Sequence, residues 1–539
     1  MGKDKYGDIA KEKLEKELEK TAGEEKTTVY EFNEDKLYVK FNETNRMYSV
    51  DKDGNIEEDN SSITKPDTTP GEFDGTGSDK DPYVIMSIED LVALSKNVSE
   101  GEKYTNRTFK LGKSLSFTFD ASYVDPMTTQ YNEYLGIDDS SVGLKEALTN
   151  KKYSGFKPIG TDLDNYTYAM NAKDFDGDNN SIEQLYINTN GRAGLFGNAA
   201  AVSNLKLTGT VISTGDYAGG LGGKTISYVK NCTINVNVQS EGSHTGGIVG
   251  GYVKAENCIN YGTVNGKYQV GGIAGGIGGT MTNCKNYGNV TGKNTVGGIA
   301  GQQGWAINCI NYGKVVATEH RAGGINGNNG GQRIDKCINY GEIIAPDYVG
   351  GIVGNGGRIT NSINKGKVTG TKTENSYVGG ISGIFNDIPI ENCLNEGELN
   401  GRQLTGGIVG GMPFTQSENS KIVNCFNIGK VTGKEYVGEI AGGKDGYGTH
   451  YVQKCYGIEG RNELFGGMKS RPGRGFIEID ENSKLYSEEY VKKQEFLDIL
   501  NNYVDEYNAG DKSETGEIEL VKWEFDSKTG YPTLVLDIN

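Results

Sequence analysis

Cysteine and histidine are the residues of this chain whose chemistry would be most diagnostic. Zinc centres use cysteines in close pairs, often with histidines nearby. The eight cysteines instead lie one per repeat of a recurring motif, and the three histidines (His244, His320 and His450) are scattered. This spacing argues against a metal centre or a cofactor site and predicts a ladder of buried, free thiols. The predicted ladder consists of Cys232, Cys258, Cys284, Cys309, Cys337, Cys393, Cys425 and Cys455.

Carboxylates and nucleophiles give no enzyme signature. The sequence contains no His-Glu-x-x-His, no Gly-x-Ser-x-Gly and no complete phosphate-binding Gly-x-x-x-x-Gly-Lys-Ser/Thr. Asp174–Asn180 resembles a calcium loop, but Asn179 and Leu185 stand where an EF-hand needs glycine and glutamate. A turn into Ile182 is the better interpretation, with a structural calcium as the alternative. We therefore expect a non-enzymatic protein, the alternative being a β-helix carbohydrate-active enzyme such as a polysaccharide lyase or hydrolase.

Tyrosine recurs at one place in four successive repeats. These residues are Tyr261, Tyr287, Tyr312 and Tyr340, and Lys365 and Glu396 take the same place further on. The neighbour of an inward-facing residue in a strand faces outward, so the rings should lie on the surface. Exposed aromatic rings suit sugars or protein partners. Stacking for stability alone explains them equally well.

Asparagine accompanies both of these rows. One set directly precedes the cysteine position, as at Asn257 and Asn283, and a second set follows three residues later. Asparagine tolerates left-handed backbone and can hydrogen-bond to its equivalents in neighbouring repeats. We expect structural ladders, among whose members are Asn260, Asn286, Asn311 and Asn339.

A glycine-rich unit of the chain must position all these residues. A Gly-Gly pair recurs from Gly246 to Gly406 at steps of 25 to 29 residues, which is typical of a solenoid. Ile273 and Ile299 exemplify one apolar position of the repeat, and Val264 and Val290 another. Short β-type segments separated by glycine bends, without helical periodicity, predict one coil of a right-handed parallel β-helix. We expect about ten such coils.

The repeat also resembles a known family. Gly-Gly-Ile-Val-Gly-Gly followed by Asn257-Cys-Ile-Asn-Tyr-Gly-Thr-Val-Asn-Gly266 looks like the GLUG repeat of bacterial surface proteins. Phe73-Asp-Gly-Thr-Gly and the closing Gly530-Tyr-Pro-Thr-Leu534 extend the resemblance over about residues 72–539. The resemblance implies a secreted or wall-attached β-solenoid and no single activity.

Charge and hydropathy bound the partners and the location. The formal net charge is −17, and no Lys/Arg cluster dominates a face, which disfavours nucleic acid or an anionic membrane. No run of 18 apolar residues occurs, so no membrane span is expected here. With the family resemblance, this predicts an extracellular protein attached to a bacterial cell surface.

Residues 1–63 differ from the repeats and predict a small α+β domain. A charged helix at Ile9–Lys20 precedes three short strands, around Val29–Phe32, Leu37–Phe41 and Met47–Val50. This arrangement resembles the globular start of Gram-positive pilin-like proteins, in which a hydrophobic helix comes first. We expect such a helix before Met1 in the natural protein, and other pilin-like subunits as partners.

The remaining boundaries follow from composition. Residues 64–71 form a polar, proline-containing linker, and residues 72–192 an N-terminal cap with irregular first coils. Ser87–Asp90 is a capping box for a helix to about Val98 that should cover the open solenoid end. Regular repeats are expected over 193–467, and a C-terminal cap over 468–539 with a helix at Ser487–Asn508. The expected function is an adhesin or a pilus-like filament component that presents the solenoid to a surface glycan or host protein.

Overall fold

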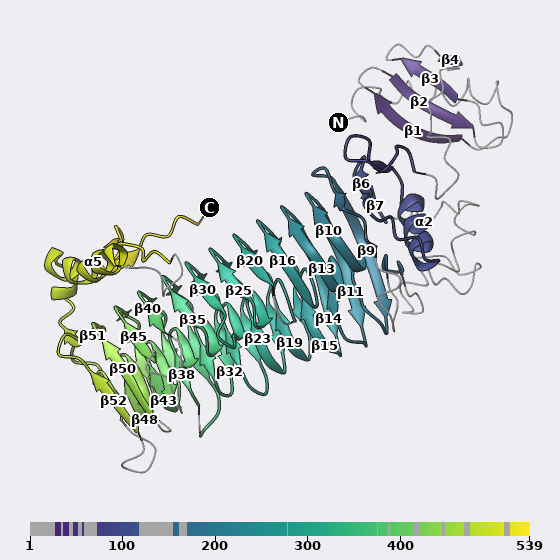
Figure 1. Ribbon diagram of the computed structural model, residues 1–539. Coiled ribbons are helices and arrows are strands. Elements are labelled where there is room, and N and C mark those ends of the chain that lie inside the picture. Colours follow the sequence, from purple (N-terminus) through teal and green to yellow (C-terminus); the bar gives the residue numbers. More distant parts are fainter. Residues whose placement is uncertain are drawn as a thin grey trace, which may run out of the picture. The chain divides into compact units, whose positions relative to one another are not determined.

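The structure is a computed structural model in which the chain forms two compact units, residues 1–72 and 73–539 (Figure 1). The residues that the structure describes are 27–33, 36–41, 47–51, 56–58, 73–117, 155–160, 170–276, 279–374, 376–385, 389–413, 420–444, 448–467, 475–510 and 518–538. The helix expected at Ile9–Lys20, the linker at 64–71 and the insertion expected at 120–152 lie outside these residues.

The first unit contains a four-stranded antiparallel meander. Three of its strands match the predicted segments, and a fourth short strand continues the meander. The strands are β1 (Thr27–Asn33), β2 (Lys36–Phe41), β3 (Met47–Asp51) and β4 (Ile56–Glu58).

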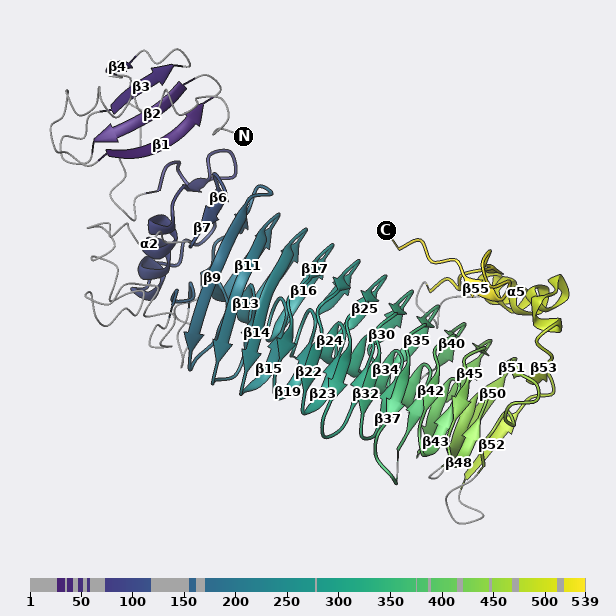
Figure 2. The ribbon, with the colours of Figure 1, turned by 180° about the vertical axis from the view of Figure 1, so that it is seen from behind.

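The second unit is a β-solenoid of about 12 turns, and strands make up 48% of the structure. Its coils stack along one axis and pair in parallel, so that each face is a long parallel sheet (Figure 2). The first of these sheets has 14 strands. They are β5 (Tyr83–Ile85), β6 (Thr108–Leu111), β8 (Asp174–Asp176), β10 (Phe196–Ser203), β13 (Gly222–Lys230), β16 (Tyr252–Glu256), β20 (Thr280–Thr282), β25 (Trp305–Ile307), β30 (Arg333–Asp335), β35 (Arg358–Thr360), β40 (Ile390–Glu391), β45 (Lys421–Val423), β50 (Gly448–Gln453) and β52 (Gly475–Ile479).

The second sheet starts as single long strands and then divides into two columns, because β14 pairs with both β17 and β18. The undivided strands are β7 (Leu115–Ser116), β9 (Ser181–Thr189), β11 (Lys206–Ser213) and β14 (Thr233–Ser240). The first column contains β17 (Ile259–Asn260), β21 (Lys285–Asn286), β26 (Ile310–Asn311), β31 (Ile338–Asn339), β36 (Ile363–Asn364), β41 (Leu394–Asn395), β46 (Phe426–Asn427), β51 (Tyr456–Ile458) and β53 (Lys484–Tyr486). The second contains β18 (Val264–Asn265), β22 (Val290–Gly292), β27 (Val315–Ala317), β32 (Ile343–Ala345), β37 (Val368–Gly370), β42 (Leu399–Asn400) and β47 (Val431–Thr432).

The glycine-rich corners form two further parallel sheets. The nine-stranded one contains β12 (Ala218–Gly219), β15 (Ser243–Gly246), β19 (Tyr268–Gly271), β23 (Asn294–Gly297), β28 (Ala322–Gly323), β33 (Val349–Gly350), β38 (Val378–Gly379), β43 (Gln403–Gly406) and β48 (Glu435–Gly438). The six-stranded one contains β24 (Ala300–Gln302), β29 (Asn326–Asn328), β34 (Val353–Asn355), β39 (Ser382–Ile384), β44 (Val409–Met412) and β49 (Ala441–Lys444).

One core runs along the solenoid interior. The isoleucine and cysteine positions of the repeat stack within it without solvent exposure, as at Ile299 and Cys309. The valine position builds a second apolar row that includes Val264 and Val290. Because each coil covers the next, no coil could bury these side chains alone.

The second glycine of each Gly-Gly pair has a steric reason. A Cβ atom on Gly298 would lie 2.3 Å from Cγ of Asn311, and one on Gly272 would lie 2.4 Å from Cγ of Asn286. Neither distance is compatible with a real contact, so the buried asparagines of the coil require glycine opposite them. The second glycine of each pair and the inner asparagine thus pack directly against each other.

Helix α2 (Ile88–Ser99) packs on the solenoid core at its N-terminal end. The predicted capping box is confirmed, since the Asp90 amide donates to Ser87 Oγ at 3.1 Å and the Ser87 amide to Asp90 Oδ2 at 2.9 Å. Leu91 and Leu94 are fully buried, as expected.

The solenoid continues beyond residue 467, the predicted end of its regular repeats. Strands β52 and β53 pair in parallel with β50 and β51 without a Gly-Gly pair or the cysteine motif. Alternating residues such as Phe476 and Ile477 can form a strand without the repeat pattern, so parallel pairing extends into the segment predicted as the C-terminal cap. Together with the irregular first coils, this raises the number of turns above the ten predicted.

The C-terminal segment folds back over one flank of the solenoid (Figures 1 and 2). A short 3-10 turn, η2 (Tyr490–Lys492), precedes α5 (Gln494–Ala509), and β54 (Trp523–Phe525) and β55 (Pro532–Leu534) form an antiparallel pair. The helix predicted from residue 487 thus begins seven residues later, at Gln494, after the separate turn. Among the described residues, no helix combines the length and apolarity that crossing a bilayer requires.

Candidate functional site: an uncovered flank of polar ladders

The outer face of the column β17, β21, β26 and β31 carries the predicted tyrosines. Strand residues alternate between the two faces, so within one coil Asn260 is buried while Ile259 and Tyr261 face outward. Each coil therefore adds one member to three outward rows: an asparagine at the bend, a variable residue, and a tyrosine. We call the open flank the bend asparagines Asn231 to Asn308, the variable residues Ile259 and Lys285, and the tyrosines Tyr261 to Tyr340.

The four tyrosine rings form a continuous face-to-face stack. Ring centroids are 4.9 Å apart for Tyr261–Tyr287, 4.6 Å for Tyr287–Tyr312 and 5.0 Å for Tyr312–Tyr340, with planes within 14° of parallel. Their side chains stay 39–46% exposed. Partial burial raises the pKa of the Tyr312 phenol, and its neighbours' phenols add to the shift.

This stacking narrows what the tyrosines can bind. Each inner ring face is covered by the next ring, so the stack exposes ring edges and hydroxyl groups rather than flat platforms. A sugar could lie on a ring face only at the two ends of the stack, at Tyr261 and Tyr340. The row is better described as a ladder of phenol hydroxyls than as the stacking platform that the sequence suggested.

The asparagines at the bend form a second ladder, on the outer side of the coils. All adopt left-handed backbone, with φ between 49° and 54°, which asparagine tolerates better than most residues. Each Nδ2 donates to Oδ1 of the preceding coil, at 3.0 Å for Asn283 to Asn257 and 3.2 Å for Asn308 to Asn283. The members of this outer ladder are Asn204, Asn231, Asn257, Asn283, Asn308, Asn361, Asn392 and Asn424.

The C-terminal segment covers the same flank in the later coils. It buries the outward row Ile310, Ile338, Ile363, Leu394, Phe426 and Tyr456 under residues such as Leu500 and Trp523. The outer asparagines contact its backbone directly. Asn361 Nδ2 donates to the Glu519 carbonyl at 2.9 Å, and the Val521 amide donates to Asn361 Oδ1 at 2.8 Å.

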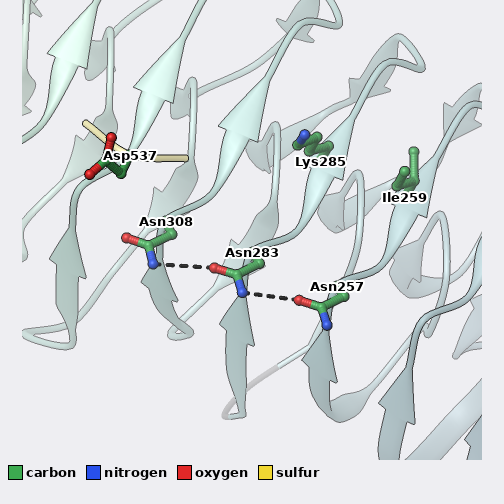
Figure 3. Close-up of a pocket in the computed structure, with 6 residues that line it drawn as sticks. All are labelled: Asn257, Ile259, Asn283, Lys285, Asn308 and Asp537. Atoms are coloured by element: carbon green, nitrogen blue, oxygen red, sulfur yellow. Dashed lines mark hydrogen bonds between the residues drawn. The ribbon is translucent and has the colours of Figure 1, made fainter. Parts of the chain in front are cut away.

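A pocket of about 420 Å³ lies where this cover ends. It is lined by Asn257, Asn283, Asn308, Ile259, Lys285 and Asp537 (Figure 3). Oδ1 of Asn308 is buried there without a hydrogen-bond partner in the described part of the chain. The lining residues include one carboxylate and one ammonium group, so they do not supply the pair of carboxylates that glycoside hydrolysis uses.

The cysteine and inner asparagine ladders lie inside the solenoid. The eight thiols are free and buried. Cys309 Sγ donates to the Met281 carbonyl at 3.3 Å, and burial raises the pKa of the Cys309 thiol far above its usual range. Nδ2 of Asn286 donates to Oδ1 of Asn311 at 2.9 Å, and Asn311 repeats this with Asn339. These residues stabilise the stack and lie out of reach of a ligand.

The acidic loop at Asp174 uses its carboxylates within the protein. Asp174 accepts a hydrogen bond from Ser203 at 2.8 Å, and Asp176 accepts one from Asn204 at 2.9 Å. Asp178 pairs with Lys110 at 2.9 Å. Over the described residues, no group of three or more acidic, histidine or cysteine side chains gathers in a geometry suited to a metal ion.

The covering of the flank by the C-terminal segment is the feature that sequence reasoning missed. A signal was present, because the outward position after each cysteine changes from Thr233, Ile259 and Lys285 to uniformly apolar residues from Ile310 onward. An apolar row on an outward face requires a cover. The tyrosine row ends two coils after the cover begins, where Lys365 and Glu396 take its place and form an ion pair of 3.1 Å.

Comparisons with known proteins give one partial sequence match and one structural match. No family model matches the chain. Halomucin of Haloquadratum walsbyi is 29% identical over 198 residues, a stretch that covers 33% of this chain and only 2% of halomucin. A crystal structure from Bacteroides ovatus, provisionally named an immunoglobulin A1 protease, aligns with 86% of this chain and 95% of its own at 19% identity and a TM-score of 0.31.

Proposed function

We propose that this chain is a non-enzymatic, extracellular bacterial surface protein whose solenoid presents the open flank to a binding partner, as an adhesin does. The observation that carries the proposal is the open flank itself. Ladders of phenol hydroxyls and side-chain amides run side by side on one face, and the C-terminal segment buries the variable row between them only from Ile310 onward.

The architecture supports display at a distance. A solenoid in which each coil hydrogen-bonds to the next along parallel sheets is a stiff rod. The similarity to halomucin over 33% of the chain, and to GLUG-repeat surface proteins in the repeat pattern, favours an extracellular setting. The small N-terminal unit is proposed as the pilin-like base through which the rod is attached or assembled.

Surface display is tested on cells of the source bacterium. Antibodies against the purified chain should label intact cells, and brief protease treatment of those cells should remove the labelled protein. A cytoplasmic control protein should stay protected in the same cells. Labelling only after the cells are broken would contradict the proposal.

A further inference from the structure

The outer asparagine ladder already binds a polypeptide within this molecule. In three of the coils beneath the C-terminal segment, Nδ2 of the outer asparagine makes two hydrogen bonds. One goes to the preceding coil of the ladder or to Asp335, and the other goes to a backbone carbonyl of the segment. The second contacts are Asn361 to Glu519 at 2.9 Å, Asn392 to Val521 at 2.8 Å and Asn424 to Leu500 at 3.2 Å.

In the open flank, the asparagines keep the hydrogen bond to the preceding coil but have no hydrogen bond to the described part of the C-terminal segment. Asn231, Asn257, Asn283 and Asn308 each donate one Nδ2 hydrogen to the preceding coil. Within the described residues their other amide hydrogen has no acceptor. An amide nitrogen carries two donors, so a row of unused donors continues directly from the row that holds the C-terminal segment.

An acceptor site completes the match with a peptide backbone. Asn361 uses both of its amide atoms on the segment, donating to the Glu519 carbonyl and accepting from the Val521 amide. At Asn308, which lines the pocket with Asp537, the corresponding Oδ1 has no partner in the described chain and no accessible surface, so an incoming N–H group reaches it only when the pocket opens. A peptide backbone offers both a carbonyl and an N–H group, and therefore satisfies both kinds of atom.

We propose that the open flank from Asn231 to Asn308 binds an extended polypeptide segment of a partner protein, through the backbone contacts that Asn361 and Asn392 make with residues 519–521. Ile259 offers an apolar contact to one side chain of that segment. Lys285 forms no ion pair with a described residue, so it favours an acidic side chain two residues further on. Asp537 already brings a carboxylate to this pocket.

A polypeptide is thereby named as the ligand class of the open flank. This proposal rests on the binding role proposed above and does not depend on surface display. The test uses the purified intact chain. A library of short random peptides on phage is selected against it, and enriched peptides are synthesised and measured by fluorescence anisotropy. A glycan array probed with the same preparation distinguishes the competing ligand class.

The decisive variant is Asn257→Gly with Asn283→Gly, because glycine keeps the left-handed backbone while removing the amides. We expect it to weaken binding of the selected peptides about tenfold or more. Asn106→Gly, at another exposed left-handed position (φ 61°), is the matched control and should bind as the unmodified chain does. Thermal melting of each variant checks that the solenoid is intact.

Three outcomes would overturn the inference. Selection could enrich no peptide, or the enriched peptides could bind the double variant as tightly as the unmodified chain. A glycan could instead bind, with its binding lost in the double variant, which would make the flank a carbohydrate site and leave the adhesive role standing. Loss of surface labelling on cells would contradict the proposed function without touching this result.

Discussion

The carboxylate of Glu439 ends the inner asparagine ladder. Its Oε2 accepts a hydrogen bond from Nδ2 of Asn427 at 2.8 Å, and its Oε1 accepts one from Asn462 at 2.8 Å. Glu439 occupies the position that the second glycine holds in the earlier repeats, and it is fully buried. The break in the glycine pattern therefore marks the end of the inner asparagine ladder, where Glu439 accepts the hydrogen bond of the last asparagine side chain.

Glu439 predicts a pH-dependent stability. Burial raises the pKa of its carboxyl above the usual 4.5, so the folded state holds a proton that the unfolded state releases. Its contribution is present below the unfolded pKa and is lost as pH rises through the folded one. In urea titrations from about pH 4 to about pH 8, the unmodified chain should lose stability relative to Glu439→Gln as pH rises.

The exposed residue Glu481 provides the control for this measurement. Glu481→Gln, at an exposed position, should leave the free energy of unfolding nearly unchanged and so controls for the substitution itself. A constant difference between Glu439→Gln and the unmodified chain over the whole range would show that Glu439 does not titrate in this way.

The fit between Gly298 and Asn311 predicts a steric effect. Gly298→Ala would place a Cβ atom 2.1 Å from the Gly324 carbonyl oxygen and 2.3 Å from Asn311 Cγ. We expect a loss of about 1–3 kcal/mol or more in the free energy of unfolding. Gly510→Ala, whose nearest contact would be the Tyr507 carbonyl oxygen at 3.3 Å, needs a much smaller adjustment and should cost clearly less. Equal effects would contradict the packing account.

The inner asparagine ladder predicts a larger loss. Asn311→Ala would remove the acceptor of Asn286 and the donor to Asn339 and to the Gly313 carbonyl. Leaving several buried polar groups unpaired should cost roughly 2–5 kcal/mol by urea unfolding. Asn265→Ala, at an exposed position of β18, is the control and should be nearly neutral. A neutral Asn311→Ala would mean that the ladder is not a stabilising element.

The burial of the cysteine ladder predicts that its thiols do not react with thiol reagents in the folded state. Burial raises the pKa of the Cys309, Cys425 and Cys455 thiols far above their usual range, which disfavours the reactive thiolate. A thiol reagent should label none of the eight cysteines in the native chain and all of them in denaturant. Labelling of the native protein, or a mass showing disulfides, would be the contrary result.

Periodicity made the solenoid predictable, because identical positions in successive coils face identical neighbours. Ile299, Cys309 and Asn311 could thus be placed from one repeat and transferred to the others. The C-terminal segment could not be placed this way, since Trp523 occurs once and its partner on the solenoid, Asn392, lies over a hundred residues earlier in the chain. The row from Ile310 to Tyr456 was the only hint of where the segment packs.

The candidate site likewise has features that the sequence predicts and features that only the structure shows. Sequence spacing identified the row from Tyr261 to Tyr340 and its outward direction. It could not show that the rings cover one another's faces, because this depends on side-chain rotation rather than on spacing. Spacing also could not distinguish Asn283 from Asn392. One amide hydrogen of Asn283 has no acceptor among the described residues, whereas the equivalent hydrogen of Asn392 is donated to the Val521 carbonyl.

Adhesion tests the central claim most directly. Cells displaying the intact chain are applied to immobilised glycans and extracellular proteins, and attachment is compared with cells displaying Asn257→Gly, Asn283→Gly and Lys285→Glu together. Lys434→Glu, on another part of the surface, controls for the change in charge. We predict that attachment falls at least about tenfold in the triple variant and is retained in the control. Equal attachment by all three cell lines would contradict the account.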